Sequence, residues 1–189
     1  MLNFKNDESS FKVVIKFFDP KTMTSSFSIY VKNKFLSYYN YKTKCAVGKR
    51  GIGLKRKEGD LITPKGTFKI KEIFYRKDRI GNLKSKIKKK VIKKNMGWCD
   101  DSKSNKYNKL ITFPFKYNAE KFFIKENKYD IILVLDYNMN PIMKNKGSAI
   151  FIHVAKKDFP PTHGCIAIKK NEIKKLVKKI NIRTKVKIS

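Results

Sequence analysis

The stretch that organises this chain is Ala149-Ile150-Phe151-Ile152-His153-Val154, followed after a short loop by Thr162-His163-Gly164-Cys165-Ile166-Ala167-Ile168. Apolar residues dominate both of its ends, which predicts short β-strands at residues 149–154 and 165–168. The stretch contains the only two histidines of the protein and one of its three cysteines. A cysteine nucleophile requires a base such as an imidazole beside its thiol, because the thiolate is the reactive form and a free thiol is mostly protonated at neutral pH. We therefore expect the chemistry of the chain to lie here.

Short β-strands are predicted along most of the remaining chain. Period-two alternation or apolar runs between Gly, Pro, Asn and Asp residues mark strands at residues 11–18, 27–31, 67–74 and 131–135. Two strands also flank Thr63-Pro64-Lys65-Gly66, in which Pro in the second position and Gly in the fourth suit a type I turn. The sequence therefore predicts a β-hairpin at this tetrapeptide.

The clearest helix is predicted over residues 171–180. Apolar residues recur there at positions 173, 176, 177 and 180, and Asn171 is a suitable N-cap. Residues 119–123 are compatible with a shorter helix, although their pattern is ambiguous. Residues 84–94 contain seven lysines and are predicted to form an exposed loop or strand edge that its charge keeps soluble.

The composition indicates one mainly β domain that spans residues 1–189. The chain is long enough for a single core, and no internal repeat, linker or shift of composition marks a second domain. With 41% hydrophobic residues, fourteen Phe and nine Tyr, it has ample material to bury, so we expect a globular protein.

The formal net charge of +31 raises nucleic-acid binding as a function, since cationic side chains that neutralise phosphates give sequence-independent affinity. Only five of the 46 cationic residues are arginine, however, and the planar guanidinium is the better partner for phosphates and base edges. A basic nucleic-acid-binding module is therefore the alternative of another class, and nucleic acid is not the partner we expect. An anionic substrate or polymer is compatible with the charge.

The sequence shows no export signal and no membrane span. Acidic residues stand near the N-terminus, where a secretory signal is basic, and no apolar run approaches the roughly 20 residues of a spanning helix. Three cysteines, Cys45, Cys99 and Cys165, make an odd number that suits a reducing compartment better than a disulfide framework. As the sequence stands we expect a cytoplasmic protein, or a periplasmic or cell-wall protein if an unseen route exports it.

Two other interpretations of the cysteine and histidines are open on the residues alone. A lone cysteine is most often a small buried hydrophobe. A zinc site is the second interpretation, with ligands drawn from His153, His163, Cys165 and either Cys45 or Cys99. The closely spaced ligand pairs of structural zinc sites are missing, which favours a nucleophile with no metal and no other cofactor.

Two motifs resemble the signatures of the YkuD-type L,D-transpeptidase family. His153 followed by Thr162-His163-Gly164-Cys165 resembles the family's histidine and its Ser/Thr-His-Gly-Cys segment. The segment Gly59-Asp60-Leu61-Ile62-Thr63-Pro64-Lys65-Gly66-Thr67-Phe68, preceded by Gly48-Lys49-Arg50-Gly51, is similar to the signature G-D-x-x-T-P-x-G-x-F. Further pieces of similarity are Trp98-Cys99-Asp100-Asp101, Tyr107-Asn108 and residues 147–153. Two signatures in the right order are far less probable by chance than one, and the resemblance covers about residues 45–180.

The resemblance implies a single β-sandwich-like catalytic domain with one or two peripheral helices. It makes Cys165 the nucleophile and His153 the base that activates it. The backbone carbonyl of Val154 would orient the imidazole ring, and His163 would line the cleft.

The same resemblance assigns the surroundings of the nucleophile. Thr162 would border the cleft, and the backbone amides around Gly164 and Cys165 would form an oxyanion hole. Gly66 would belong to the scaffold below the cleft. Asp60 is interpreted as a turn residue rather than a catalytic one.

The implied activity is acyl transfer on peptidoglycan or muropeptide stem peptides. The sulfur would attack the carbonyl between a third-residue diamino acid and D-alanine, and an amine of another stem would complete a cross-link. With water as the acceptor the same bond is hydrolysed, so a cytoplasmic L,D-carboxypeptidase of muropeptide recycling is the alternative. Three departures from the family pattern bear on substrate choice: a short segment between His153 and Thr162, Val154 in place of glycine, and Ala167 where many members have arginine.

Overall fold

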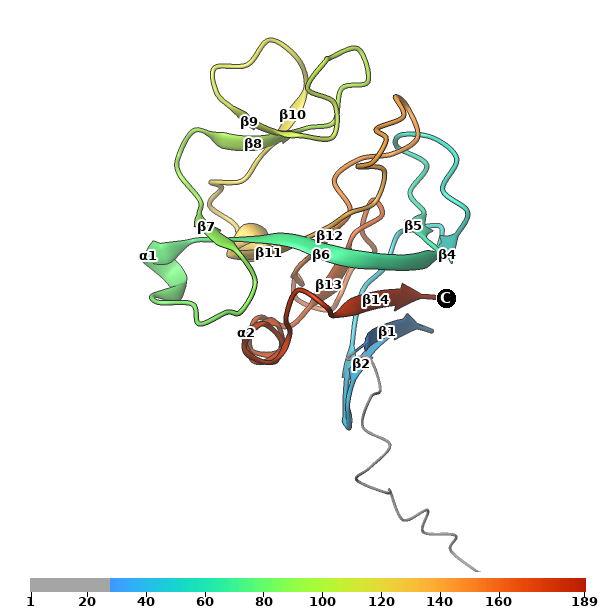
Figure 1. Ribbon diagram of the computed structural model, residues 1–189, viewed down its shortest axis with the longest axis vertical. Coiled ribbons are helices and arrows are strands. Elements are labelled where there is room, and N and C mark those ends of the chain that lie inside the picture. The colour runs from blue at the N-terminus through green and yellow to red at the C-terminus, as the bar shows by residue number, and fades with distance from the viewer. Residues whose placement is uncertain (1–27) are drawn as a thin grey trace, which may run out of the picture.

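The computed structural model describes residues 28–189, so the strand predicted over residues 11–18 lies outside the described part. The described chain is mainly β, as the sequence predicts, and Figure 1 shows its arrangement. In chain order the strands are β1 (Ser28–Lys32), β2 (Phe35–Tyr38), β3 (Tyr41–Lys44), β4 (Ile52–Gly53), β5 (Thr63–Pro64), β6 (Gly66–Tyr75), β7 (Lys89–Val91), β8 (Met96–Cys99), β9 (Leu110–Thr112), β10 (Ala119–Lys121), β11 (Ile131–Leu135), β12 (Phe151–Val154), β13 (Ile166–Ile168) and β14 (Lys185–Ile188). The helices are α1 (Lys77–Ile80), α2 (Lys170–Lys179) and the 3₁₀ turn η2 (Asn127–Tyr129).

The strands form one large sheet and two small ones. The large sheet has the order β13-β12-β11-β6-β14-β1-β2-β3, and β7 pairs with β6. A three-stranded sheet, β10-β8-β9, lies over one face of the large sheet, and α2 lies on the opposite side (Figure 1). This layering agrees with the sandwich-like domain that the resemblance implies.

Strand β11 separates two apolar cores. Ile131, Leu133 and Leu135 belong to the core that also holds the buried residues of α2. Ile132 and Val134 face the other core, beneath the β10-β8-β9 sheet. All five residues are buried because both faces of the strand are covered, which explains a continuous apolar run in place of an alternating one.

Helix α2 packs one face and exposes lysines on the other. Ile173, Leu176 and Val177 are buried, and each such side chain contributes about 1.5–3 kcal/mol through the apolar surface that it removes from water. Asn171 is not the N-cap: the cap position is Lys169, with no side-chain cap. The helix starts directly after β13, and the carbonyl of Lys169 accepts from the amides of the first turn, so Asn171 falls inside the helix.

The predicted hairpin at Thr63-Pro64-Lys65-Gly66 is wrong. Strand β5 pairs in parallel with β4, with the amide of Thr63 donating to the Gly51 carbonyl at 2.9 Å. Strand β6 begins at Gly66 and pairs with β14 and β11 instead. The turn residues therefore connect two sheets, and local turn chemistry could not reveal partners that come from elsewhere in the chain.

Residues 119–123 form no helix in the structure. Residues 119–121 make strand β10, which pairs antiparallel with β8, and Phe122 is fully buried beside Trp98. The pairing with β8 outweighs a short and ambiguous local pattern.

The lysine-rich segment, residues 84–94, is partly a strand. Residues 89–91 pair with β6. Ile87 and Ile92 are buried and anchor the segment, while its lysines lie mainly outside.

A short segment after β3 closes the large sheet into a barrel-like shape. The amide of Ala46 donates to the carbonyl of Ala167 at 2.8 Å, and the reverse bond is 2.9 Å long. Further along, Thr162 donates to the Val47 carbonyl and accepts from the Lys49 amide, both at 2.9 Å. Residues 46–49, here called the closing segment, therefore hold both ends of the stretch Thr162–Ala167 in place.

No helix among residues 28–189 combines the length and the apolar character needed to cross a bilayer.

Replacing Gly48 by alanine should destabilise the fold strongly. A methyl group there would lie 2.3 Å from the Leu61 carbonyl oxygen, so the backbone must move, at a cost of about 3 kcal/mol in the free energy of unfolding. Gly53→Ala is the control, since its added carbon meets only Ile62 Cγ2 at 3.8 Å. Urea unfolding of the two variants measures the difference, and equal midpoints would show that the closing segment tolerates displacement.

Candidate active site

The pairing of β12 with β13 brings His153 and Cys165 to one face of the sheet. The strands are parallel, with His153 opposite Ala167, and side chains two positions apart on a strand point the same way. Cys165 lies two residues before Ala167 and so shares the face of His153. The alternate residues, such as Ile152 and Ile166, point into the core that contains α2.

The His153 ring is buried and held by its neighbour's backbone. Its Nδ1 lies 2.9 Å from the carbonyl oxygen of Val154, and because a carbonyl only accepts, Nδ1 is the protonated nitrogen and Nε2 the free acceptor. The edge of Tyr129 packs against the ring at 5.9 Å between centroids. Burial, assisted by the Lys128 ammonium and opposed by the bond to Val154, lowers the pKa of His153 to about 4.

The Cys165 thiol is protonated in the resting structure. Its Sγ donates to the carbonyl oxygen of Ala149 at 3.1 Å, and the residue is only partly exposed. Burial and the Glu120 carboxylate raise the pKa of the thiol to about 12, against the opposing pull of Lys128 and Lys55. The Cys165 thiol and the His153 imidazole are therefore both neutral at pH 7, rather than ionised as a thiolate–imidazolium pair.

Thr162 braces the turn before the cysteine. Its hydroxyl donates to the carbonyl of Cys165 at 2.6 Å and accepts from the amide of Gly164 at 3.1 Å. Gly164 has φ +139°, and an added Cβ would lie 3.0 Å from the Ile62 carbonyl oxygen, so glycine suits both the conformation and the space. The side chain of His163 is exposed.

Two cavities meet at Cys165. The first, of about 510 Å³, is here called the acidic cavity; Cys165, Gly164 and His163 line it together with four carboxylates, Glu58, Asp100, Asp101 and Glu120. The second, of about 260 Å³, is here called the histidine cavity; its lining includes His153, His163, Cys165, Ala167, Lys128 and Lys156. Glu120, His163 and Cys165 belong to both, so Cys165 is bordered by two spaces whose other lining residues differ in charge.

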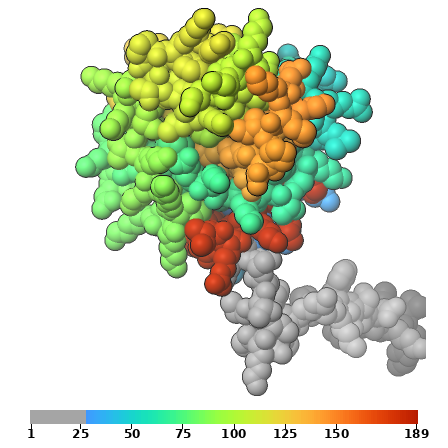
Figure 2. Space-filling model, turned by 45° about the horizontal axis from the view of Figure 1, so that its top comes forward, coloured from blue at the N-terminus to red at the C-terminus, as the bar shows by residue number. Residues whose placement is uncertain are grey.

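Three loops form the walls of the acidic cavity. They are the loops around residues 54–61, 100–118 and 137–150, which gather on the face of the molecule shown in Figure 2. The Tyr107 hydroxyl donates to the Glu58 carboxylate at 2.5 Å, and the Glu58 amide donates to the carbonyl of Asn145 at 2.9 Å. These contacts tie the three loops to one another.

Asn108 connects the β10-β8-β9 sheet, here called the upper sheet, to the cysteine. Its Oδ1 accepts from the Trp98 indole at 3.0 Å and from the amide of Ala149 at 3.1 Å, while its Nδ2 donates to the carbonyls of Tyr137 and Asn138. Ala149 in turn accepts from the Cys165 thiol. The position of the sulfur therefore depends on a side chain 57 positions earlier in the chain.

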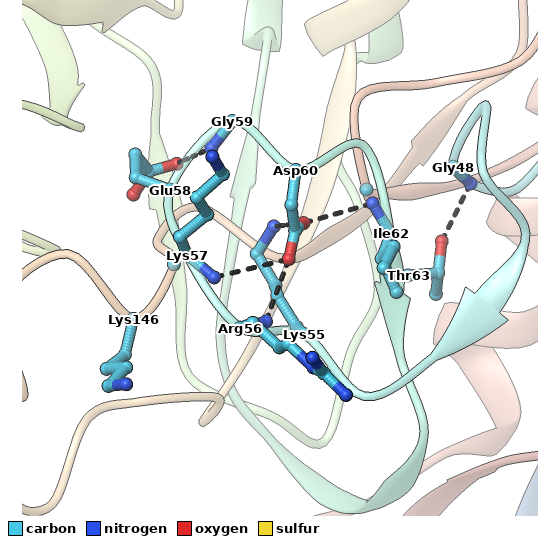
Figure 3. Close-up of polar contacts among 12 residues, drawn as sticks. Gly48, Lys55, Arg56, Lys57, Glu58, Gly59, Asp60, Ile62, Thr63 and Lys146 are labelled. Atoms are coloured by element: carbon cyan, nitrogen blue, oxygen red, sulfur yellow. Dashed lines mark hydrogen bonds and ion pairs between the residues drawn. The ribbon is translucent and has the colours of Figure 1, made fainter.

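Asp60 organises the loop that carries Glu58, as Figure 3 shows. Its buried carboxylate accepts from Lys55 Nζ at 2.6 Å and from the amides of Arg56, Lys57 and Ile62. Although burial opposes ionisation, these hydrogen bonds lower the pKa of Asp60 to about 2. The interpretation of Asp60 as a turn residue is confirmed by these bonds.

The zinc ligand set considered from the sequence is not assembled. Among residues 28–189 no group of three or more His, Cys, Asp or Glu side chains is placed to bind a metal ion. Cys45 and Cys99 are buried, and neither lines the two cavities beside Cys165.

The sequence predicts the cysteine, the histidines and their loop as site residues but indicates no role for the carboxylates of the acidic cavity. In the sequence, Asp100 and Asp101 belong to a motif without an assigned role, and Glu120 lies in a segment compatible with a helix. One signal was available: acidic residues number only 15 in the chain, so an adjacent pair such as Asp100-Asp101 is conspicuous.

Cys165 directly precedes β13, His153 lies on the paired strand β12, Thr162 holds the turn between them, and two cavities border the cysteine. This arrangement is suited to acyl transfer. Comparison with protein-family models gives a match to the YkuD L,D-transpeptidase catalytic domain over residues 17–188, nearly the whole chain. The protein therefore belongs to the YkuD family of L,D-transpeptidase catalytic domains, whose members act on peptidoglycan stem peptides. No match was found among curated proteins.

Replacing Asp60 by asparagine should cost about 3 kcal/mol of unfolding free energy, because Lys55 would be left buried without its counter-charge. The pKa of Asp60 is lowered by folding, so its contribution is complete above pH 4 and is lost as the pH falls towards 2. The gap between wild type and Asp60→Asn in urea unfolding should shrink over that range. Asp158→Asn, at an exposed carboxylate, is the control, and a gap independent of pH would contradict the assignment.

Proposed function

We propose that the protein is an L,D-transpeptidase in which Cys165 is the nucleophile and His153 the general base. The sulfur attacks the carbonyl carbon that joins the third stem residue, a diamino acid, to D-alanine. A carbon–sulfur bond forms, the carbon–nitrogen bond breaks, and D-alanine leaves with its amine. The single observation that supports this most directly is that Cys165 lies where two cavities meet, with His153 on the same sheet face and lining one of them.

The neutral resting state determines how the proton moves. Because the thiol has a raised pKa and the imidazole a lowered one, a standing ion pair is unfavourable in the free protein. The thiol proton is transferred to Nε2 of His153 as the sulfur bonds to the carbonyl carbon, and the imidazolium then protonates the departing amine. The Val154 carbonyl keeps Nδ1 protonated and holds the ring through both transfers.

The oxyanion of the tetrahedral intermediate requires hydrogen-bond donors near the sulfur. The Gly164 amide is engaged by the Thr162 hydroxyl, so we assign the Cys165 amide as the first donor. Thr162, which also donates to the Cys165 carbonyl, acts as a positioning residue for this turn.

The acyl-enzyme is completed by an amine or by water. An amine from a second stem peptide gives a cross-link, or a free D-amino acid gives an exchange product. Water gives a tripeptide, the L,D-carboxypeptidase reaction. Incubation with a purified disaccharide tetrapeptide and mass analysis of the products separates these outcomes.

Cys165→Ala should lower turnover of the tetrapeptide by at least about 1000-fold, because the attacking atom is lost. His153→Ala should lower it by about 100- to 10,000-fold, the usual range for a general base. Cys45→Ala is the matched control, since its thiol pKa is also raised to about 12 but it lines neither cavity beside Cys165. By the family resemblance, a carbapenem should add covalently to the wild type and not to Cys165→Ala. Full turnover in either site variant would refute the assignment.

The acid limb of kcat/KM should lie below pH 5 rather than near 6.5. The base is neutral His153, whose pKa is lowered to about 4, so activity is kept until the pH falls far enough to protonate it. Lys128→Gln should move this limb towards neutrality, because the ammonium is one of the groups that lower the pKa. A limb at pH 6.5 in the wild type would show that another group is the base.

A further inference from the structure

The buried side chain of Tyr129 lies between His153 and a carboxylate of the upper sheet. Its ring centroid is 5.9 Å from that of His153, and the two ring planes are inclined by 80°. Its hydroxyl donates to the carboxylate of Glu120 on β10. One side chain, only 3% exposed, therefore connects the upper sheet to the imidazole on β12. Neither Tyr129 nor Glu120 has a role in the mechanism given above.

Tyr129 is the hydrogen-bond donor in its pair with Glu120. Burial, together with the negative charge of Glu120, raises the pKa of the Tyr129 hydroxyl well above its usual value, so the hydroxyl keeps its proton. A buried hydroxyl without an acceptor costs about 1–3 kcal/mol, and Glu120 supplies the acceptor. Lys128 completes the cluster, since its Nζ lies 3.8 Å from Glu120 Oε1 and 4.4 Å from the centroid of the Tyr129 ring.

The backbone around Tyr129 is fixed separately from its hydroxyl. The Arg79 guanidinium donates to two carbonyls of the segment 124–130 and to the buried Asp130 carboxylate, and Arg76 donates to a third carbonyl, all at 2.8–3.0 Å. The chain has only five arginines, so two of the five hold this one segment. Tyr129 is therefore fixed at its backbone and at its hydroxyl, and its ring lies between these two points.

The His153 ring needs a second contact to fix its orientation. The bond from Nδ1 to the Val154 carbonyl holds one edge of the imidazole. The torsion that turns a histidine ring has broad minima, so one hydrogen bond leaves the ring free to tilt. The near-perpendicular Tyr129 ring limits this tilt. Orientation matters because a general base must lie within hydrogen-bond reach of the proton that it accepts.

We propose that Tyr129 is a positioning residue for His153 and that Glu120 anchors Tyr129 in that position. The Tyr129 ring keeps Nε2 of the imidazole directed at the Cys165 thiol, and the bond to Glu120 keeps the Tyr129 ring in place. Neither residue gains or loses a proton in this role. The inference rests on the proposed function, because it concerns the base of that reaction.

Two substitutions of Glu120 separate the anchor from the charge. Glu120→Gln and Glu120→Leu both remove the negative charge, but only Gln keeps an oxygen that can accept from Tyr129. For release of D-alanine from the tetrapeptide, kcat should fall about tenfold in Glu120→Leu and no more than about twofold in Glu120→Gln. KM should be similar in both, because the orientation of the base affects chemistry rather than binding.

Tyr129→Phe removes only the hydroxyl and keeps the ring, so its kcat should match that of Glu120→Leu. Because Tyr129 is buried, this variant also needs a urea unfolding curve to show that it is folded. The Glu120 side chain is 33% exposed, so the comparison of its two variants decides the question even if Tyr129→Phe is unstable.

An NMR titration of the imidazole signals tests the same contact without substrate. The chain has only two histidines, so His163→Gln identifies the signals of His153. In the wild type His153 should stay neutral down to about pH 5, because burial lowers its pKa to about 4. In Glu120→Leu a loosened Tyr129 admits water to the ring, and the midpoint should rise by about one pH unit. Loss of a negative charge alone would lower an imidazole pKa, so charge cannot explain a rise.

The control is Tyr107→Phe, which removes another buried tyrosine hydroxyl from a carboxylate, that of Glu58. Glu58 lines the acidic cavity and not the histidine cavity, so the titration of His153 should be unchanged. Equal kcat in Glu120→Gln and Glu120→Leu would overturn the positioning role and leave the proposed function intact. If the wild type releases no D-alanine, the proposed function fails, and equal His153 midpoints in the two Glu120 variants would then overturn the positioning role as well.

Discussion

The backbone pairing between the closing segment, residues 46–49, and the stretch Thr162–Ala167 is the constraint on which the rest of the site depends. It supplies four hydrogen bonds of 2.8–2.9 Å between parts of the chain that are more than a hundred positions apart. Strand β13 would otherwise be an edge strand, with free amides and carbonyls at the point where Cys165 emerges. Closing the sheet fixes the turn before the cysteine, and Gly48 allows the closing segment to approach the β5 region closely enough to do so.

Two cavities with different lining charges border the neutral Cys165 thiol. A neutral thiol and imidazole avoid the cost of buried charge in the resting protein. In the mechanism that we propose, the thiol ionises only when the substrate carbonyl receives the sulfur's electrons. The lysines near His153 and the carboxylates near Gly164 then give the approach to the sulfur a direction.

The sequence allowed prediction of those parts of the fold and site that are determined by neighbours in the chain. The strand at residues 131–135 was predictable because its apolar run is unbroken, and the cysteine was predictable because two histidines stand close to it in sequence. The helix expected at residues 119–123 and the hairpin at Thr63–Gly66 were wrong because each segment pairs with strands that no local pattern identifies. The acidic cavity was missed for the same reason, since Asp100 and the other carboxylates come from separate loops that only the fold brings together.

The hydrogen bonds of the Asn108 side chain restrict how the upper sheet can move relative to the rest of the site. This buried amide is held within the upper sheet by Trp98, and it joins that sheet to two carbonyls of the loop after β11 and to the amide of Ala149, which precedes β12. Asn108 belongs to the β8–β9 connection, so swinging the upper sheet away as a lid would break its three bonds to Tyr137, Asn138 and Ala149, at about 1 kcal/mol or more each. A hinged gate is therefore disfavoured, and under the proposed function a stem peptide would approach Cys165 through the cavities as they stand.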